Sequence, residues 1–479
     1  MNLALMAPEI LIGIVAMLLL LLGAWRSAET RRELVGGLAL LTLATCLIIL
    51  WKEGMHWPTS TFNNQYVVDP FSGFMKILML LATLLPLMIS WDYLQQHNLD
   101  TPEFFVLTLF ALLGGMMMAS SGDFISLYLG LELMSLSIYV LAASRRDNAL
   151  SNEAGLKYFV LGSVASGLLL YGISLLYGVT GSTQFVEIQR FLAGEGLEHS
   201  RMVINLGVTL VLAGLSFKVA AAPFHMWAPD VYEGAPTPVT AFMAAMPKVA
   251  AFSAFYRVFV EAFAPMHAYW SNVFQLVALL SLAVGAIAAI AQSNLKRMLA
   301  YSSIGHVGYI LIGLVAGGDM GHQGVLVYLT IYVFMNIGAF GLILMLNKEG
   351  IGDNIEDFKG LGHKRPMLAL LMAIFMFSMA GIPPLAGFIG KLYIFMAAVK
   401  AGYLALAIAG VIFSAIGAFY YIRVVKVIYF DQPREEAFQM PVGAMGGVAV
   451  AVCAALVLVW GVFPASLTST VILTVSTFR

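Results

Sequence analysis

Residues 214–240 read GLSFKVAAAPFHMWAPDVYEGAPTPVT, and they decide how the rest of the chain is interpreted. The stretch holds Lys218, His225, Asp230 and Glu233 and is interrupted by prolines at 223, 229, 236 and 238, although the chain around it is apolar. Because proline lacks a backbone N–H and clashes with the preceding turn, it breaks a helix. A lysine beside such a break is costly in a bilayer unless protein or water surrounds it. Asp230 and Glu233 are expected to cap or bind the backbone at the interruption.

The composition is that of a membrane protein. Of the 479 residues, 61% are hydrophobic and 11% charged, whereas soluble domains have about 45–50% apolar and about 25% charged residues. A membrane-spanning helix needs roughly 20 apolar residues, so the chain can hold a dozen spans or more. The first apolar run, residues 10–22, follows Glu9 rather than a basic segment, and we expect it to be a span and not a signal peptide.

Polar residues, prolines and glycines divide the chain into fourteen predicted transmembrane helices. The predicted helices cover residues 9–25, 34–51, 70–92, 103–120, 123–144, 152–178, 202–222, 238–263, 271–292, 298–316, 324–346, 366–382 continuing with a break to 400, 403–430 and 442–464. The intervals between them are too short for a folded soluble domain. The predicted fold is therefore an all-α polytopic membrane protein.

Basic residues gather on one set of loops. The odd-numbered loops hold fourteen of them, namely Arg26, Arg31, Arg32, Arg145, Arg146, Lys296, Arg297, Lys348, Lys359, Lys364, Arg365, Arg423, Lys426 and Arg434. The even-numbered loops hold four, namely Lys52, Arg190, Arg201 and Lys400. Because cytoplasmic loops carry the excess of lysine and arginine, we expect the odd-numbered loops on the cytoplasmic side and both termini on the periplasmic side.

One acidic side chain lies deep in a predicted span. Glu132 is the tenth residue counted from Asp123, which is about 13 Å along a helix and close to the middle of a hydrocarbon core about 30 Å thick. Tyr128, Glu132, Ser135 and Tyr139 follow each other at i, i+4, i+7 and i+11 and share one face. We expect this polar stripe to face protein or internal water.

Three lysines lie similarly deep. They are Lys218 in the opening stretch, Lys248 after Pro247, and Lys391 in a second interrupted stretch, SMAGIPPLAGFIGKLYIF at 378–395. Interrupted spans in corresponding places of two halves are typical of transporters built from repeats, with the ion path at the interruptions. We predict that these lysines and the buried glutamate move protons across the membrane.

Other ionisable residues leave two interpretations open. Lys76, Lys157 and Arg257 lie nearer helix ends, where a cation can snorkel or form a structural ion pair as readily as it can carry protons. His225, between prolines, and His306, in YSSIGHVGY, can each relay a proton or stabilise a loop by a hydrogen bond.

Several classes of function find no support in the sequence. A GxGxxG between a strand and a helix and a GxxxxGK[ST] are both missing, so nucleotide binding is not indicated. Cys46 and Cys453 are isolated and cannot supply the four thiolates of an iron–sulfur cluster, and no zinc spacing occurs. The net charge of -1 argues neither for nor against any partner. Energy for moving a proton must therefore come from outside this chain.

Six segments together resemble a known family. They are GLELMSLSIYVL with Glu132, EAGLKYFVLGSVAS with Lys157, the opening stretch with Lys218 and His225, MPKVAAF with Lys248, QSNLKRMLAYSSIGHVGY with His306, and GIPPLAGFIGKLYIF with Lys391. These segments resemble the antiporter-like membrane subunits of bacterial proton-pumping NADH:quinone oxidoreductase, respiratory complex I, and the likeness covers nearly the whole chain. The resemblance implies two inverted five-helix repeats, helices 4–8 and 9–13, with broken helices 7 and 12. It divides the chain into N-terminal helices 1–102, a first repeat 103–263, a second repeat 264–430 and a C-terminal helix 431–479.

The resemblance also implies roles for the candidate residues. Glu132 and Lys218 correspond to a coupling ion pair, Lys248 to a central relay, Lys391 to a terminal proton site, and Lys157 to an assisting site near the cytoplasmic side. The chain would then be part of an enzyme without carrying a redox centre, because flavin, iron–sulfur clusters and quinone belong to other subunits. Its partners would be other membrane subunits, including homologous antiporter-like ones, in the bacterial inner membrane.

Three homologous subunits share this pattern, and two features separate them. The largest has a long additional C-terminal helix, which is not expected here, and the middle one has a glutamate at the position of Lys391, so the resemblance points to subunit N. A subunit of a multisubunit cation/proton antiporter, with the same fold and many of the same charges, is the alternative. A transporter of an organic solute would need a roomy central site, and a purely structural scaffold would leave the buried charges without a purpose.

Overall fold

The computed structural model describes residues 2–25, 28–53, 59–194, 200–347, 352–432 and 443–478. Thirteen helices in this part of the chain are long and apolar enough to cross a membrane. At the remaining predicted position, 366–400, two helices of 15 residues follow each other across a break. The prediction of an all-α polytopic membrane protein is therefore confirmed.

The N-terminal part holds three membrane helices and a short hairpin. Its elements are η1 (Leu3–Met6), α1 (Ala7–Trp25), α2 (Ala28–Glu53), β1 (Thr59–Thr61), β2 (Tyr66–Val68) and α3 (Pro70–Gln96). The two strands pair antiparallel, with Ser60 opposite Val67. Asp69 begins α3 by accepting a hydrogen bond from the backbone N–H of Ser72 at 2.7 Å, the usual role of an N-cap side chain. The hairpin was not predicted, because strands of three residues leave too short a pattern.

The seventh predicted span is broken, as expected, but it breaks earlier than expected. The elements of this half are α4 (Pro102–Ala119), α5 (Phe124–Ala142), α6 (Ala149–Thr180), α7 (Phe185–Ala193), α9 (Arg201–Lys218), α10 (Trp227–Gly234), α11 (Thr237–Phe255) and the π-helical η2 (Tyr256–Ala262). The predicted span continued to residue 222, whereas α9 ends at Lys218. Ala220 has a left-handed φ of 59°, and in a helix the ring of Pro223 would clash with the carbonyl four residues earlier, that of Val219. The chain therefore leaves the helix several residues before Pro223.

The second half contains the other interruption. Its elements are η3 (Ala264–Met266), α12 (His267–Ile290), α13 (Leu295–Ala316), α14 (Gly318–Leu346), η4 (Ile355–Phe358), α15 (Leu361–Lys364), α16 (Pro366–Ala380), α17 (Ala386–Lys400) and α18 (Leu404–Phe430). Gly381 follows α16 with a φ of 89°, a conformation that favours glycine and commonly ends a helix. The break between α16 and α17 lies inside the stretch 378–395, as the sequence predicts.

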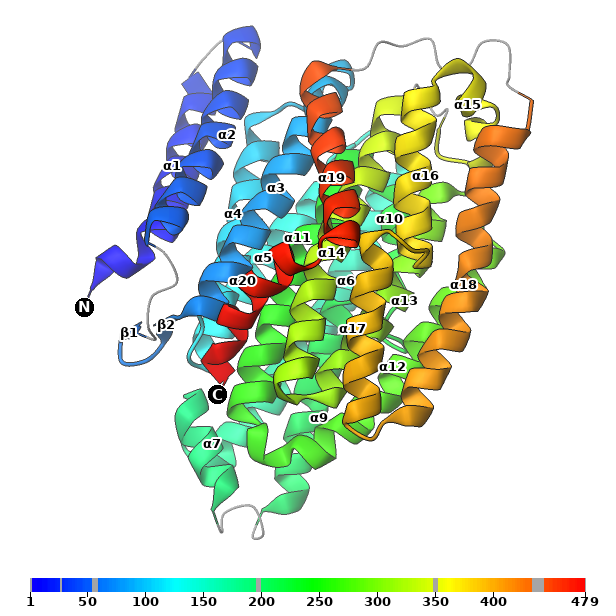
Figure 1. Cartoon of the computed structure of the whole chain (residues 1–479). Helices are drawn as coiled ribbons and strands as arrows, with labels where there is room; N and C mark the ends of the chain where they lie inside the picture. The colour runs from blue at the N-terminus through cyan, green and yellow to red at the C-terminus, as the bar shows by residue number, and fades with distance from the viewer. Residues whose placement is uncertain are drawn as a thin grey trace.

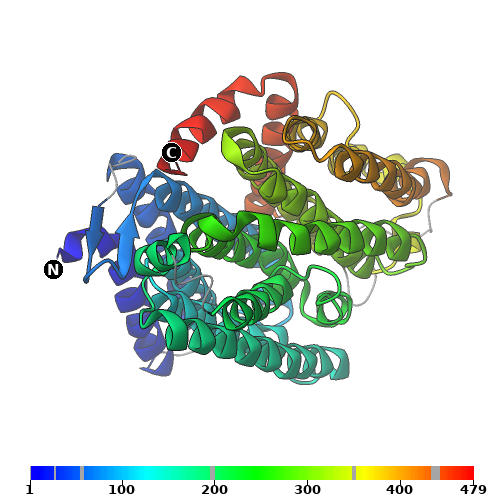
Figure 2. The same cartoon turned by 90° about the horizontal axis from the view of Figure 1, so that it is seen from below.

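Two further helices complete the chain: α19 (Ala444–Val462) and α20 (Ala465–Val475), followed by η5 (Ser476–Phe478). The short α20 was not predicted, and it runs obliquely against α3 and α14 (Figure 1). The centre of the bundle is formed by α11, α13 and α14. In the most apolar stretch of these spans, 100%, 94% and 89% of the residues are buried inside the protein. Seen from below, these helices run between the N-terminal and the C-terminal elements (Figure 2). Side chains on them are therefore shielded from lipid.

Both described ends of the chain lie at the same end of the bundle (Figure 1). The backbone N–H of Asn2 donates to Thr61 Oγ1 at 3.1 Å, and the ring of Phe478 contacts that of Phe71. At the opposite end, Arg423 donates to the carbonyl of Ile290, the last residue of α12, and to that of Gln292 just beyond it. Arg423 and Lys426, which were counted with a loop, therefore lie within α18. Arg26, Lys348 and Arg434 lie outside the described residues.

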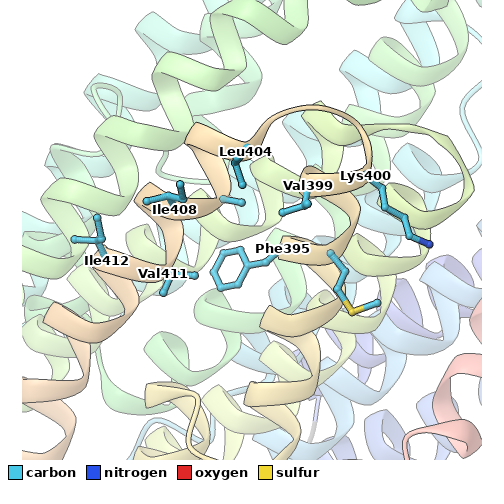
Figure 3. Close-up of a pocket in the computed structure, with 9 residues that line it drawn as sticks. Phe395, Val399, Lys400, Leu404, Ile408, Val411 and Ile412 are labelled. Atoms are coloured by element: carbon cyan, nitrogen blue, oxygen red, sulfur yellow. The ribbon is translucent and has the colours of Figure 1, made fainter.

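The outer surface is apolar, as a bilayer requires. One shallow groove of about 510 Å³ runs between α17 and α18 and is lined by Phe395, Val399, Leu404 and Ile408, with Lys400 at its edge (Figure 3). The groove is open to the outside and lies apart from the buried ionisable residues, so it does not belong to the candidate site.

Candidate functional site

Lys218 lies at the first break, as the last residue of α9, with only 5% of its surface exposed. Its Nζ donates hydrogen bonds to Ser135 Oγ at 2.9 Å and to Tyr139 OH at 3.1 Å. Both acceptors belong to the polar stripe that the sequence predicts on α5. The stripe therefore faces protein, as expected.

Glu132 is joined to Lys218 through a third side chain. Ser166 of α6 has its Oγ 2.5 Å from Glu132 Oε1 and 3.4 Å from Lys218 Nζ. A hydroxyl can donate to a carboxylate while it accepts from an ammonium. The resemblance implies an ion pair between Glu132 and Lys218. In the described part of the chain the two side chains do not form a direct ion pair but are bridged by Ser166. Sequence reasoning missed this serine.

The backbone around the first break is held by the protein itself. The indole Nε1 of Trp227 donates to the carbonyl of Phe217 at 3.0 Å, and the N–H of Ala222 donates to Ser281 Oγ at 2.8 Å. The Trp227 ring stacks on Tyr158 with ring centres 4.1 Å apart. Because freed backbone groups in a membrane must find partners inside the protein, these contacts stabilise the break and fix the position of Lys218.

Lys248 lies on the wholly buried α11 and is 2% exposed. Its Nζ donates to Ser303 Oγ of α13, and that hydroxyl is 2.7 Å from Tyr332 OH of α14. The ammonium also lies 5.5 Å from the centre of the Tyr332 ring, within the range of a cation–π contact. Three central helices therefore meet at this lysine.

His306 has a hydroxyl partner on each ring nitrogen. Nδ1 lies 2.7 Å from Tyr328 OH and Nε2 lies 3.1 Å from Tyr421 OH. Tyr421 in turn hydrogen bonds to Ser302, the neighbour of Ser303 on α13. Since a hydroxyl can donate or accept, this environment accommodates either tautomer of the imidazole. Of the two open interpretations of His306, a role limited to a loop is excluded because it lies in the middle of a buried helix.

Lys391 reaches back across the second break. Its Nζ donates to the carbonyls of Met379 and Ala380, both at 3.0 Å, and to Ser414 Oγ at 2.8 Å. These carbonyls end α16 and have no helical donor of their own. A cavity of about 10 Å³ joins Lys391 and Ser414 to His306 and Tyr421. That volume is close to the smallest that holds one water molecule.

Two candidates lie apart from these clusters. Lys157 is 40% exposed and forms ion pairs with Glu153 at 2.7 Å and with Asp230 at 2.6 Å. His225 is half-buried in the segment between α9 and α10, and within the described residues no hydrogen bond links it to another candidate.

Asp230 and Glu233 do not cap the backbone at the break, contrary to expectation. Arg297 of α13 binds both, at 2.7 and 2.8 Å, and Asp230 also binds Lys157 of α6. The expectation was wrong because basic residues distant in the sequence reach these carboxylates. The ion pairs fasten α10 to two neighbouring helices.

Two other buried cations are fully explained by ion pairs. Lys76 is 2.7 Å from Glu9 Oε1 and from Tyr66 OH. Arg257 makes two contacts with Asp69, at 2.8 and 2.9 Å, and one with Glu261 at 2.5 Å. For Lys76 and Arg257 the contacts therefore favour a structural ion pair over a role in carrying protons.

Comparisons with known proteins identify the family of the chain. Residues 121–417 match the membrane protein family described as NADH:quinone oxidoreductase/Mrp antiporter, TM. A relative from Magnetococcus marinus, NADH-quinone oxidoreductase subunit N, is 59% identical over 98% of this chain and 97% of its own. The subunit of the same name from Paramagnetospirillum magneticum is 50% identical over 96% and 94%.

Solved structures give the same result. A chain of respiratory complex I from Thermus thermophilus is 33% identical, with a TM-score of 0.82 over 96% of this chain and 98% of that one. A chain of the Mrp complex from a Dietzia species has a TM-score of 0.87 over 100% and 98% at 21% identity, which shows a shared fold. The chain thus belongs to the NADH:quinone oxidoreductase/Mrp antiporter membrane family and, within it, to the family of NADH-quinone oxidoreductase subunit N.

Proposed function

We propose that this chain is the antiporter-like membrane subunit through which an NADH:quinone oxidoreductase moves protons, and that Glu132, Lys218, Lys248, His306 and Lys391 carry them. One observation supports this most strongly. Within the described residues, the lysines at 218, 248 and 391 are buried among hydroxyls and carbonyls and have no carboxylate in ion-pair contact, whereas Lys76 and Arg257 have such partners.

The difference matters because a buried charge without a counter-charge is costly. Releasing the proton from such a lysine removes a costly buried charge, whereas releasing it from an ion-paired lysine leaves the carboxylate without its counter-charge. Moving one charge across the membrane costs about 2.3 kcal/mol per 100 mV. A hydrogen bond to a charged group contributes about 1.5–3 kcal/mol, so changes in the surroundings of such lysines, starting from the bridged Glu132 and Lys218, can supply energy of that size to each transfer.

The driving energy is proposed to come from partner subunits. The relatives are named as parts of an enzyme that uses NADH and quinone, and two separate cysteines cannot hold an iron–sulfur cluster in this chain. We infer that flavin, iron–sulfur clusters and quinone lie on other subunits, and that homologous antiporter-like subunits adjoin this one in the membrane.

We infer that the protein lies in the bacterial inner membrane with both termini on the periplasmic side. The excess of basic residues on the odd-numbered loops supports this orientation. Lys157, with its ion pair to Asp230, would then lie near the cytoplasmic side, where it can assist proton uptake. His225 is proposed as a lesser participant because it lies in the break beside Lys218.

A subunit of a multisubunit cation/proton antiporter remains the second candidate, and the shared fold with the Mrp chain favours it. Membranes depleted of this chain separate the two: the first proposal requires loss of NADH-driven proton pumping, and loss of sodium/proton exchange alone would favour the second. The cavity beside Lys391 has only about 10 Å³ and is too small for an organic solute at that lysine.

The direct test replaces Lys218 by alanine in the assembled complex, with Lys400→Ala as the control because Lys400 is exposed at the end of α17. NADH-driven acidification of proteoliposomes should be lost in the first variant and kept in the second. Undiminished pumping by the Lys218→Ala complex would overturn the proposal.

A further inference from the structure

The motif YSSIGHVGY on α13 carries two adjacent serines that serve different tyrosines. Ser303 bonds to Lys248 and to Tyr332 of α14. Ser302 bonds to Tyr421 of α18. Because adjacent helical residues point in directions about 100° apart, the pair extends the hydroxyl network from the centre of the bundle towards α18. The sequence gives no sign that Tyr421 belongs to this network.

Tyr421 lies between two candidate residues, because it contacts His306 and lines the same cavity as Lys391. Its OH is 3.1 Å from His306 Nε2. Its side chain also lines the cavity of about 10 Å³ that Lys391, Ser414 and His306 line. The tyrosine is 3% exposed, so its hydroxyl has contacts only inside the protein.

The other tyrosine on His306 differs in one respect. Tyr328 OH lies 2.7 Å from Nδ1, but Tyr328 does not line the cavity beside Lys391. His306 also lines the cavity, but each of its ring nitrogens is hydrogen-bonded to a tyrosine hydroxyl. Tyr328 can therefore orient the imidazole, whereas Tyr421 lies both on Nε2 and on the cavity.

We propose that the Tyr421 hydroxyl passes the proton between His306 and the cavity beside Lys391, and that Ser302 is the positioning residue that holds this hydroxyl in place; this inference rests on the proposed function. A hydroxyl can donate one hydrogen bond and accept two. It takes a proton from the imidazole nitrogen while its own proton leaves to a water of the cavity or to the Lys391 amine, or the reverse. One O–H bond forms as one breaks, so the tyrosine ends neutral.

The test uses Tyr421→Phe, which removes the hydroxyl and keeps the ring, with Tyr328→Phe as the matched control on the same imidazole. The initial rate of NADH-driven proton uptake into proteoliposomes should fall by about a hundredfold for Tyr421→Phe, the lower end of what a general acid–base group contributes. For Tyr328→Phe the same rate should fall far less. The solvent deuterium isotope effect on pumping should rise for Tyr421→Phe, since proton transfer becomes rate-limiting, and a structural role would leave it unchanged.

Ser302→Ala provides an independent variant if Tyr421→Phe fails to assemble. This variant keeps the Tyr421 hydroxyl and should slow pumping less than Tyr421→Phe does. The solvent deuterium isotope effect on pumping should again rise. Pumping at the wild-type rate by Tyr421→Phe or Ser302→Ala, together with loss of pumping in Lys391→Met, would overturn this inference alone. Wild-type pumping by Lys391→Met as well would overturn the proposed function.

Discussion

Replacing Ser166 by alanine removes the hydroxyl that joins Glu132 to Lys218. The Ser166 Oγ donates to the glutamate at 2.5 Å, and a hydrogen bond to a charged group contributes about 1.5–3 kcal/mol. Because Glu132 is half-buried, the lower value is the appropriate one, and about 1.4 kcal/mol corresponds to a factor of ten in rate. We therefore expect Ser166→Ala to slow proton pumping about tenfold.

The fold should survive this substitution. Lys218 keeps its hydrogen bonds to Ser135 and Tyr139, and alanine occupies less space than serine. Ser163→Ala is the control, because Ser163 lies on the same helix, is exposed, and donates to the carbonyl of Phe159 in its own helix. The assay is the initial rate of NADH-driven acidification in proteoliposomes, with subunit content measured alongside. Equal pumping by the two serine variants at equal assembly would refute the bridging role.

Two further predictions concern stability. Gly387→Ala should destabilise the subunit by about 3 kcal/mol, the upper end of overpacking costs, because a Cβ there would lie 1.8 Å from the carbonyl of Ser378. The melting temperature of the purified complex should fall, whereas Gly167→Ala, inside α6 with open space around it, should not lower it. Asp69→Asn should cost about 3 kcal/mol, the lower end of the cost of breaking a buried ion pair, because Arg257 loses Asp69 but keeps Glu261. Burial raises the pKa of Asp69, but the Arg257 guanidinium and the Ser72 N–H outweigh burial and hold this pKa below its usual value. The stabilisation is therefore present above about pH 4 and lost as the pH falls through the lowered pKa. Thermal unfolding of wild type and Asp69→Asn should converge in acid, and a constant difference at every pH would contradict this account.

The spans and both breaks could be predicted from the sequence because each depends on local chemistry. Runs of apolar residues set the helices, and prolines and glycines set the interruptions. The stripe on α5 was also predictable, because Ser135 and Tyr139 share a face with Glu132 on one helix. The end of α9 at Lys218 was harder to predict from the sequence. The path of the backbone before Pro223 depends on the hydrogen-bond partners of residues 219–222, and one of these partners, Ser281, lies on another helix.

The partners of the buried lysines could not be predicted in the same way. Ser166 is 34 residues from Glu132, and Tyr421 is 115 residues from His306. A hydroxyl residue in an apolar helix has no local pattern that separates a relay contact from a bond to its own backbone, such as that of Ser163. Only the packing of separate helices decides between these two uses. The same holds for Arg297, whose position next to Asp230 depends on the contact between α10 and α13.

The two broken helices hold their lysines by different chemistry, although their sequences look alike. The Lys391 Nζ donates to three acceptors, and two of those are carbonyls that end α16, where the helix dipole favours a cation. Backbone acceptors cannot be withdrawn unless the helix itself moves. Lys218 instead depends on side-chain hydroxyls, one of which it shares with Glu132. A movement of Glu132 alone can therefore change the surroundings of Lys218, whereas a change at Lys391 requires α16 and α17 to shift relative to each other. On this basis the first break is suited to respond to a neighbouring charge, and the second to respond to a movement of helices.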